Sequence, residues 1–141
     1  MKKFELTSEF ITNIFGTKLF RIKALVEFGD VEAGELGGYI EKEENLDHDG
    51  DAWVYGNAKV YGNVDYAYAH GFGSEYRTTT FFRLKDGSVG VRCGCFYGTL
   101  QEFRDKVRKT HGETKKAKEY LMLADLMELR FKEENEDGKN N

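Results

Sequence analysis

The sequence of 141 residues contains no proline and only two cysteines. Two cysteines cannot form a disulfide scaffold, so we expect a reducing, cytoplasmic setting. No run of residues approaches the roughly 20 apolar side chains of a membrane-spanning helix. The first ten residues also lack the apolar stretch of a secretory signal. The sequence has sixteen glycines. Either glycine forms the turns that proline would otherwise help to form, or the fold repeats a turn that requires glycine.

The aromatic content argues for a folded chain, and the charge is unevenly distributed. Eleven Phe and eight Tyr exclude a disordered chain. Residues 1–71 carry 7 basic and 13 acidic side chains, whereas residues 72–131 carry 12 basic and 8 acidic ones. This asymmetry suggests two units with different partners. The basic excess is too small to predict duplex nucleic acid as a partner, but it suits a small anionic ligand.

A six-residue repeat begins at Gly50. GDAWVY (50–55) is followed by GNAKVY (56–61) and by a degenerate unit, GNVDYA (62–67). This period is typical of a left-handed parallel β-helix, in which each hexapeptide forms one side of a triangular coil. Alanine and valine would point inward, and glycine would occupy the corners. About one coil is too little to be stable alone, so the repeat must lean on the rest of the chain.

Strand patterns lie on both sides of this repeat. Residues 4–28 predict a β-hairpin with its turn at residues 13–17, and Gly37-Gly38 predicts a turn that enters a strand. After an aromatic connector, a second hairpin is predicted. The connector covers residues 65–77, and the hairpin joins strands at 78–85 and 89–97 through Asp86-Gly87.

Two helices complete the predicted fold. Thr99 starts the first through a T-x-x-E capping box and Gly112 ends it, while Thr114 caps a second helix that runs to about Lys132. The segment YLMLADLM (120–127) is apolar on nearly all sides, so we expect a homo-oligomer built on this helix.

We therefore predict an α+β fold made of an N-terminal β-hairpin, a short left-handed β-helix-like coil, a second hairpin and two C-terminal helices. The predicted units are residues 1–71, a ligand-binding and oligomerisation unit at 72–133, and a disordered tail at 134–141.

Paired arginines are the main candidates for ligand binding. Arg104 and Arg108 lie one turn apart on the first predicted helix, a spacing suited to phosphate oxygens. The preceding strands add further arginines and aromatic rings: Arg77, Arg83, Arg92, Phe82, Phe96 and Tyr97. Guanidinium groups bind phosphate and rings stack on bases, so this combination indicates nucleotide binding. The alternative is a solvated basic helix face paired with Glu102 and Asp105.

No catalytic constellation accompanies these residues. A phosphate-binding loop, a Rossmann glycine pattern, a nucleophile elbow and an H-E-x-x-H motif are all missing, so we expect no enzyme and no cofactor. Cys93 and Cys95 would share one face of a strand and could bind a metal with His111. The pair is more typical of small buried apolar side chains, and we predict no metal.

Two stretches resemble a phage and prophage family of hexapeptide-repeat proteins, often labelled polymer-forming or transferase-like. The first is LFRIKALVEFGDVEAGELGGYIEKEENLDHDGDAWVYGNAKVYGN (19–63), and the second, residues 78–131, resembles the C-terminal domain of the same family. The family usually carries many more hexapeptides, so this chain departs from it in the length of the repeat.

The C-terminal unit is also similar to phage anti-defence proteins that sequester the cyclic ADP-ribose messenger of the Thoeris system. Such proteins bind the nucleotide without cleaving it, often as oligomers with pockets between protomers. The resemblance implies that helix arginines and an aromatic residue on the sheet hold the ligand. Arg104 and Arg108 match the helix spacing.

We therefore expect a phage protein of the host cytoplasm that sequesters a cyclic nucleotide messenger. Arg104 and Arg108 would bind phosphate, Arg92 or Arg77 would support them, and Phe82 or Tyr97 would stack on a base. Two alternatives stay open. The chain could inhibit a host defence effector such as CRISPR, with acidic residues 27–51 mimicking nucleic acid. It could also be a shortened hexapeptide acyltransferase that uses His48 or His70, which flank the repeat.

Overall fold

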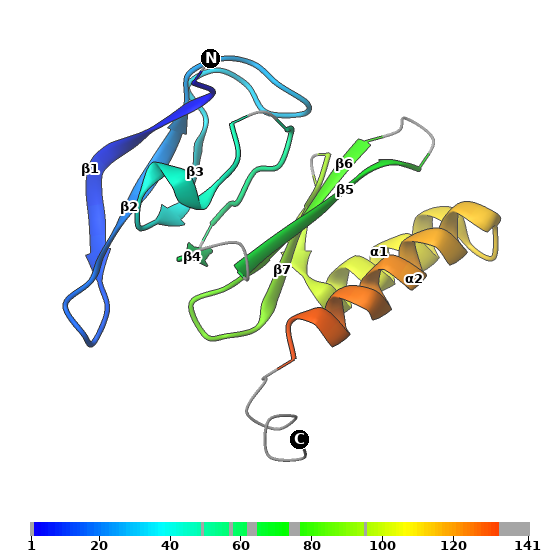
Figure 1. The fold of residues 1–141 in the computed structure, drawn as a ribbon. Coiled ribbons are helices and arrows are strands. Elements are labelled where there is room, and N and C mark those ends of the chain that lie inside the picture. The colour runs from blue at the N-terminus through cyan, green and yellow to red at the C-terminus, as the bar shows by residue number, and fades with distance from the viewer. Residues whose placement is uncertain are drawn as a thin grey trace.

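The computed structural model describes residues 2–48, 50–56, 58–61, 65–73, 77–94 and 96–132. Within these residues the chain forms two four-stranded sheets and two helices, which confirms the predicted α+β class (Figure 1). The strands are β1 (Phe4–Thr12), β2 (Lys18–Ala24), β3 (Leu36–Ile40), β4 (Lys59–Val60), β5 (Tyr66–Phe72), β6 (Arg77–Arg83), β7 (Val89–Cys93) and β8 (Phe96–Thr99). The helices are α1 (Leu100–His111) and α2 (Lys115–Arg130), and a short 3-10 turn covers Glu43–Asn45.

The first sheet has the order β1-β2-β3-β4. The hairpin predicted at the N-terminus is confirmed, because β1 and β2 pair antiparallel on either side of residues 13–17. Asn13 organises the turn: its Oδ1 accepts hydrogen bonds from the backbone N–H groups of Phe15 and Thr17, each at 2.9 Å. A short polar side chain that bonds the backbone two residues later is a common way to fix a turn.

The turn predicted at Gly37-Gly38 is wrong, because both glycines lie inside β3. A Cβ atom on Gly37 would come within 2.8 Å of the Ile22 and Trp53 side chains, and one on Gly38 within 2.9 Å of the Ala58 Cβ. The glycines therefore allow the repeat segment to pack closely across the strand.

The repeat segment buries the side chains that the six-residue pattern directs inward. Ala52, Val54, Ala58 and Val60 have no exposed surface. Gly56, at a predicted corner, has a φ of +60°, and β4 runs parallel to β3. Asn57 and residues 62–64 lie outside the described residues, and the left-handed coil stays a prediction.

The second sheet is an antiparallel meander in the order β5-β6-β7-β8. Two sequence interpretations fail here. Most of the region expected to be an aromatic connector is strand β5, in which aromatic and small side chains alternate with the period of two typical of a strand. The single strand expected at 89–97 is two strands, because the chain reverses at Gly94, whose φ is +60°.

Both helices begin where their caps predict. Thr99 Oγ1 accepts from the backbone N–H of Glu102 at 3.1 Å, and the Glu102 carboxylate accepts from the backbone N–H of Thr99 at 2.8 Å. Gly112 ends α1 with a φ of +60°, and Thr114 caps α2. The capping box, the C-terminal glycine and the second cap are therefore confirmed.

The second sheet has a hydrophobic core on each face. Phe81 belongs to the core shared with α1 and α2, whereas the next residue, Phe82, belongs to the core of the first sheet and the repeat. Successive strand residues point to opposite faces, so one sheet joins the two layers. The predicted unit boundary between residues 71 and 72 falls within β5, and the predicted tail lies outside the described residues. No helix among the described residues is long and apolar enough to cross a membrane.

Candidate ligand-binding site

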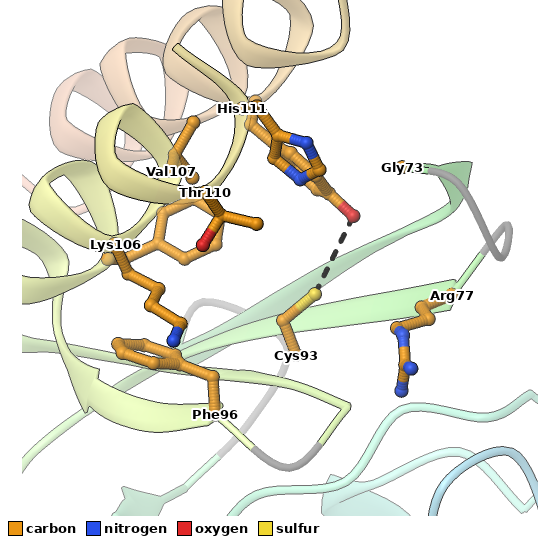
Figure 2. Close-up of a pocket in the computed structure, with 10 residues that line it drawn as sticks. Gly73, Arg77, Cys93, Phe96, Lys106, Val107, Thr110 and His111 are labelled. Atoms are coloured by element: carbon orange, nitrogen blue, oxygen red, sulfur yellow. Dashed lines mark hydrogen bonds between the residues drawn. The ribbon is translucent and has the colours of Figure 1, made fainter.

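A pocket with a volume of about 290 Å³ opens between α1, the start of α2 and the second sheet (Figure 2). Strands β6, β7 and β8, both helices and the turn after β5 contribute to it. Its lining residues are Gly73, Arg77, Cys93, Phe96, Phe103, Lys106, Val107, Thr110, His111 and Tyr120. We call this site the α1 pocket.

Basic side chains reach the α1 pocket from two elements. Helix α1 supplies Lys106 and His111, and β6 begins with Arg77. Lys106 and Arg77 lie on opposite sides of Cys93 (Figure 2). An arginine and a lysine that line the same small cavity favour an anionic ligand, and the imidazole adds a hydrogen-bonding group.

Aromatic rings form the apolar part of the wall. Phe103 is central, with its ring 5.9 Å from Phe96 and 5.6 Å from Tyr120, centroid to centroid. The Tyr120 ring is also 5.9 Å from the His111 ring. Rings in such a cluster restrict one another's rotation, so the wall is held in shape before any ligand binds.

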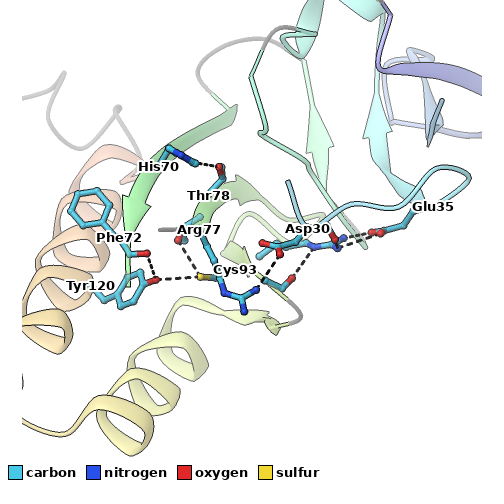
Figure 3. A network of polar contacts seen from close by, with 11 residues as sticks. Asp30, Glu35, His70, Phe72, Arg77, Thr78, Cys93 and Tyr120 are labelled. Carbon is cyan, nitrogen blue, oxygen red and sulfur yellow. Dashed lines mark hydrogen bonds and ion pairs between the residues drawn. The ribbon is translucent and has the colours of Figure 1, made fainter. Parts of the chain in front are cut away.

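A chain of hydrogen bonds fixes Tyr120 in this wall (Figure 3). Thr79 Oγ1 donates to the sulfur of Cys93 at 3.2 Å, that sulfur lies 3.7 Å from the Tyr120 hydroxyl, and the hydroxyl donates to the Phe72 carbonyl at 3.0 Å. The single O–H of Tyr120 is used in the hydrogen bond to the Phe72 carbonyl, so the Cys93 thiol is the donor in its contact with the hydroxyl oxygen. Burial and the adjacent Cys93 raise the pKa of Tyr120 above its usual range.

Two glycines give the pocket side chains their space. Gly73 has a φ of +81°, and a Cβ there would collide with the hydroxyl of Tyr120. Gly94 has a φ of +60°, and its Cβ would lie 2.9 Å from the Cζ of Arg77. Residues other than glycine rarely adopt this backbone conformation, so both positions favour glycine, and at Gly73 the buried Tyr120 side chain adds a steric reason.

Arg104, the first of the predicted phosphate ligands, joins the two helices. Its Nη2 lies 2.9 Å from the Asp125 carboxylate and 2.7 Å from that of Glu128, both on α2. Burial opposes its charge, but the hydrogen bonds and the attraction of the two carboxylates outweigh burial and raise the pKa of Arg104.

Arg108 lies one turn later and is turned to a different region. Its side chain is 57% exposed and 3.8 Å from Asp105. It lines a separate surface depression with Gly112, Lys118 and Leu121. The structure therefore gives the two predicted phosphate ligands different partners and does not bring them into the α1 pocket.

Arg92, Phe82 and Tyr97 lie on the other face of the second sheet. Arg92 pairs with Glu35 and places its guanidinium 4.9 Å from the Tyr55 ring. Phe82 is fully buried, and the ring of Tyr97 stacks against it at 6.3 Å. Of the six residues expected to bind phosphate or stack on a base, Arg77 lines the α1 pocket, and Phe96, the further aromatic candidate on the strands, lines it as well.

The remaining cysteine and histidine candidates lie in different parts of the structure. Cys93 and His111 both line the α1 pocket, whereas Cys95 lies outside the described residues. No group of three or more metal-ligating side chains occurs in the part of the chain that the structure describes. His48 accepts from the backbone N–H of Lys3 at 3.1 Å, and His70 lies 2.7 Å from the Thr78 hydroxyl.

Comparison of the chain with known proteins finds no relative. The chain matches no protein-family model, no curated protein and no solved structure.

Proposed function

We propose that the chain binds a small anionic ligand with an aromatic ring, of the nucleotide class, in the α1 pocket and does not cleave it. The observation that carries this proposal is that Arg77, Lys106 and His111 line one cavity whose wall also contains aromatic rings. Basic groups provide partners for phosphate oxygens, and aromatic side chains provide a stacking surface for a base.

The volume of the α1 pocket suits one nucleotide unit of a ligand. Ligand pockets in proteins usually have volumes of about 300–1,000 Å³, and the α1 pocket lies near the lower end at about 290 Å³. A larger cyclic nucleotide would place one base and its phosphate in the pocket and extend beyond the rim.

The sequence resemblance supplies the biological side of the proposal. A protein that binds a messenger without cleaving it lowers the concentration of free messenger. The chain would therefore act as a phage anti-defence protein that sequesters a host immune messenger in the host cytoplasm. The messenger would be of the cyclic ADP-ribose type or a cyclic oligonucleotide.

Calorimetric titration with cyclic ADP-ribose isomers and with cyclic di- and trinucleotides tests this function. We expect one of these nucleotides to bind, and Lys106→Ala to weaken it by about tenfold or more, because a hydrogen bond to a charged group contributes about 1.5–3 kcal/mol. Lys109→Ala is the matched control, since Lys109 is exposed on the same helix and Lys106 alone of the two lines the pocket.

Two results would refute the proposal. One is the absence of binding to every nucleotide tested. The other is a loss of affinity in Arg104→Ala/Arg108→Ala with no loss in Lys106→Ala, which would move the site to the helix face predicted from sequence.

A second candidate, a protein-binding inhibitor, is favoured by the tip of the first hairpin. Ile14 is 93% exposed and Phe15 is 85% exposed, on a turn whose backbone donates two hydrogen bonds to Asn13. Apolar side chains that project from a surface can anchor a partner protein, and an ordered backbone lowers the entropy lost on binding. Capture of a host defence effector by wild-type chain, lost in Ile14→Ser/Phe15→Ser, would favour this candidate over nucleotide binding.

A further inference from the structure

Arg77 lies between the α1 pocket and an acidic loop of the first unit (Figure 3). It lines the pocket, and its Nη1 is 3.1 Å from the Oδ1 of Asp30. Both side chains are about one-third exposed. A carboxylate from a distant part of the sequence therefore already occupies one donor of a pocket residue.

The loop that carries Asp30 is held by a second arginine as well. Arg92 donates to the Asp30 carbonyl at 3.2 Å and pairs with the Glu35 carboxylate. Arg92 is not among the described residues that line the α1 pocket. The loop thus stays attached when its contact with Arg77 is exchanged.

The contact between Arg77 and Asp30 is suited to such an exchange. An ion pair of this exposure contributes about 0–1 kcal/mol, because solvent screens the charges. A phosphate group offers a guanidinium two or more oxygens at higher charge than a carboxylate, and so forms the stronger pair. A ligand phosphate that reaches Arg77 therefore competes with Asp30 on favourable terms, whereas a single carboxylate does not.

We propose that Asp30 is a built-in competitor that sets the affinity and selectivity of the α1 pocket. The Asp30 carboxylate pairs with Arg77 in the structure, and a phosphate-bearing ligand takes over that guanidinium. Weakly anionic compounds such as monocarboxylates do not displace Asp30. This inference rests on the proposed function of the pocket and adds a specificity-determining residue outside its wall.

Two isosteric substitutions in the same loop separate this role from a general charge effect. Asp30→Asn and Glu35→Gln each remove one negative charge, but only Asp30 contacts a described pocket residue. We expect Asp30→Asn to bind adenosine 5′-monophosphate about two- to fivefold more tightly than wild type. Glu35→Gln and the charge-preserving Asp30→Glu should bind it as wild type does.

Calorimetry with adenosine 5′-monophosphate and with acetate, on all four proteins, tests the inference. Tighter nucleotide binding in Asp30→Asn alone, with measurable acetate binding appearing only in that variant, would support it. Equal affinities in wild type and Asp30→Asn, or equal gains in Asp30→Asn and Glu35→Gln, would overturn the role of Asp30 while the pocket proposal stands. No nucleotide binding by any of the four would overturn both.

A thermal unfolding curve, measured for each variant, shows whether that variant is folded before its affinity is compared with wild type. Asp30 has 38% of its side chain exposed, so we expect Asp30→Asn to fold. Should that variant unfold, Asp30→Ser, measured the same way, takes its place, with the same gain in affinity expected and the same equality with wild type contradicting it.

Discussion

Tyr120 connects the stability of the chain to the shape of its pocket. The Tyr120 side chain is buried. Its hydroxyl donates a hydrogen bond to the Phe72 carbonyl and accepts one from the thiol of Cys93. Its pKa is raised above the ordinary value, first by burial and then by Cys93. In the unfolded chain the same group ionises near pH 10. The folded state therefore holds this proton at a pH where the unfolded state has lost it.

The resulting prediction concerns alkaline pH. The stabilising contribution of Tyr120 is fully present below about pH 10 and is lost as the pH rises from there towards the folded-state pKa. We expect the free energy of unfolding, measured by urea titration between pH 8 and 11, to fall above about pH 10. Tyr120→Phe should make this fall shallower without abolishing it, because burial also raises the pKa of Tyr66. An equal slope in wild type and variant would contradict the assignment.

Among the contacts between helices, the ion pairs of Arg104 join α1 to α2. The side chain is 14% exposed, while its partners Asp125 and Glu128 are 75% and 67% exposed. Removing the arginine leaves both carboxylates in water, so the loss is limited to the ion pairs and to the packing of the arginine stem.

We expect Arg104→Ala to lower the free energy of unfolding by about 1 kcal/mol and to leave nucleotide affinity unchanged. Arg108→Ala, the control on the same helix, should change stability by less than about 0.5 kcal/mol. Chemical denaturation measures the first effect and calorimetry the second. A large loss of affinity with little loss of stability in Arg104→Ala would restore the binding role predicted from its spacing.

The elements most visible in the sequence are those with local signals. The capping box at Thr99, the glycine at 112 and the Asp86-Gly87 turn act through neighbours in the chain, and the structure has each of them. The local pattern predicts a turn at Gly37-Gly38, but the glycines serve a tertiary contact, because they leave room for Trp53 and Ala58. A local rule cannot distinguish that close approach from a turn.

The site was less predictable than the fold because its residues come from distant segments. Lys106 and Thr110 lie one turn apart on the predicted first helix, next to its apolar stripe, and this spacing could have marked them. Tyr120 and Gly73 carry no such signal, since only the packing of α2 on the second sheet brings them together. The arginine pair at 104 and 108 has an equally regular spacing, but acidic side chains of the chain itself lie next to both.

At the scale of the whole molecule, α2 presents an apolar stripe to solvent. Met122, Leu126 and Leu129 are 70%, 54% and 68% exposed and follow one another at intervals of four and three residues. The opposite face of the helix is buried in the core. An exposed stripe of this spacing is the pattern of a helix that pairs with another helix.

We expect the chain to form a homo-oligomer through this stripe. Light scattering at micromolar concentration should give a mass above that of one chain, 16.2 kDa. Leu126→Lys should shift it to the monomer without loss of helical circular dichroism, because the side chain already faces solvent within one chain. A monomeric wild type would refute the expectation.

Heteronuclear NMR can locate a bound nucleotide in the α1 pocket residue by residue. The labelled protein is titrated with the nucleotide that binds best in calorimetry. We predict that the largest shift changes fall on the backbone amides of Gly73, Cys93, Thr110 and His111, around the pocket wall. Changes centred instead on Arg108, Lys118 and Leu121, or no changes at saturating nucleotide, would contradict binding in the α1 pocket.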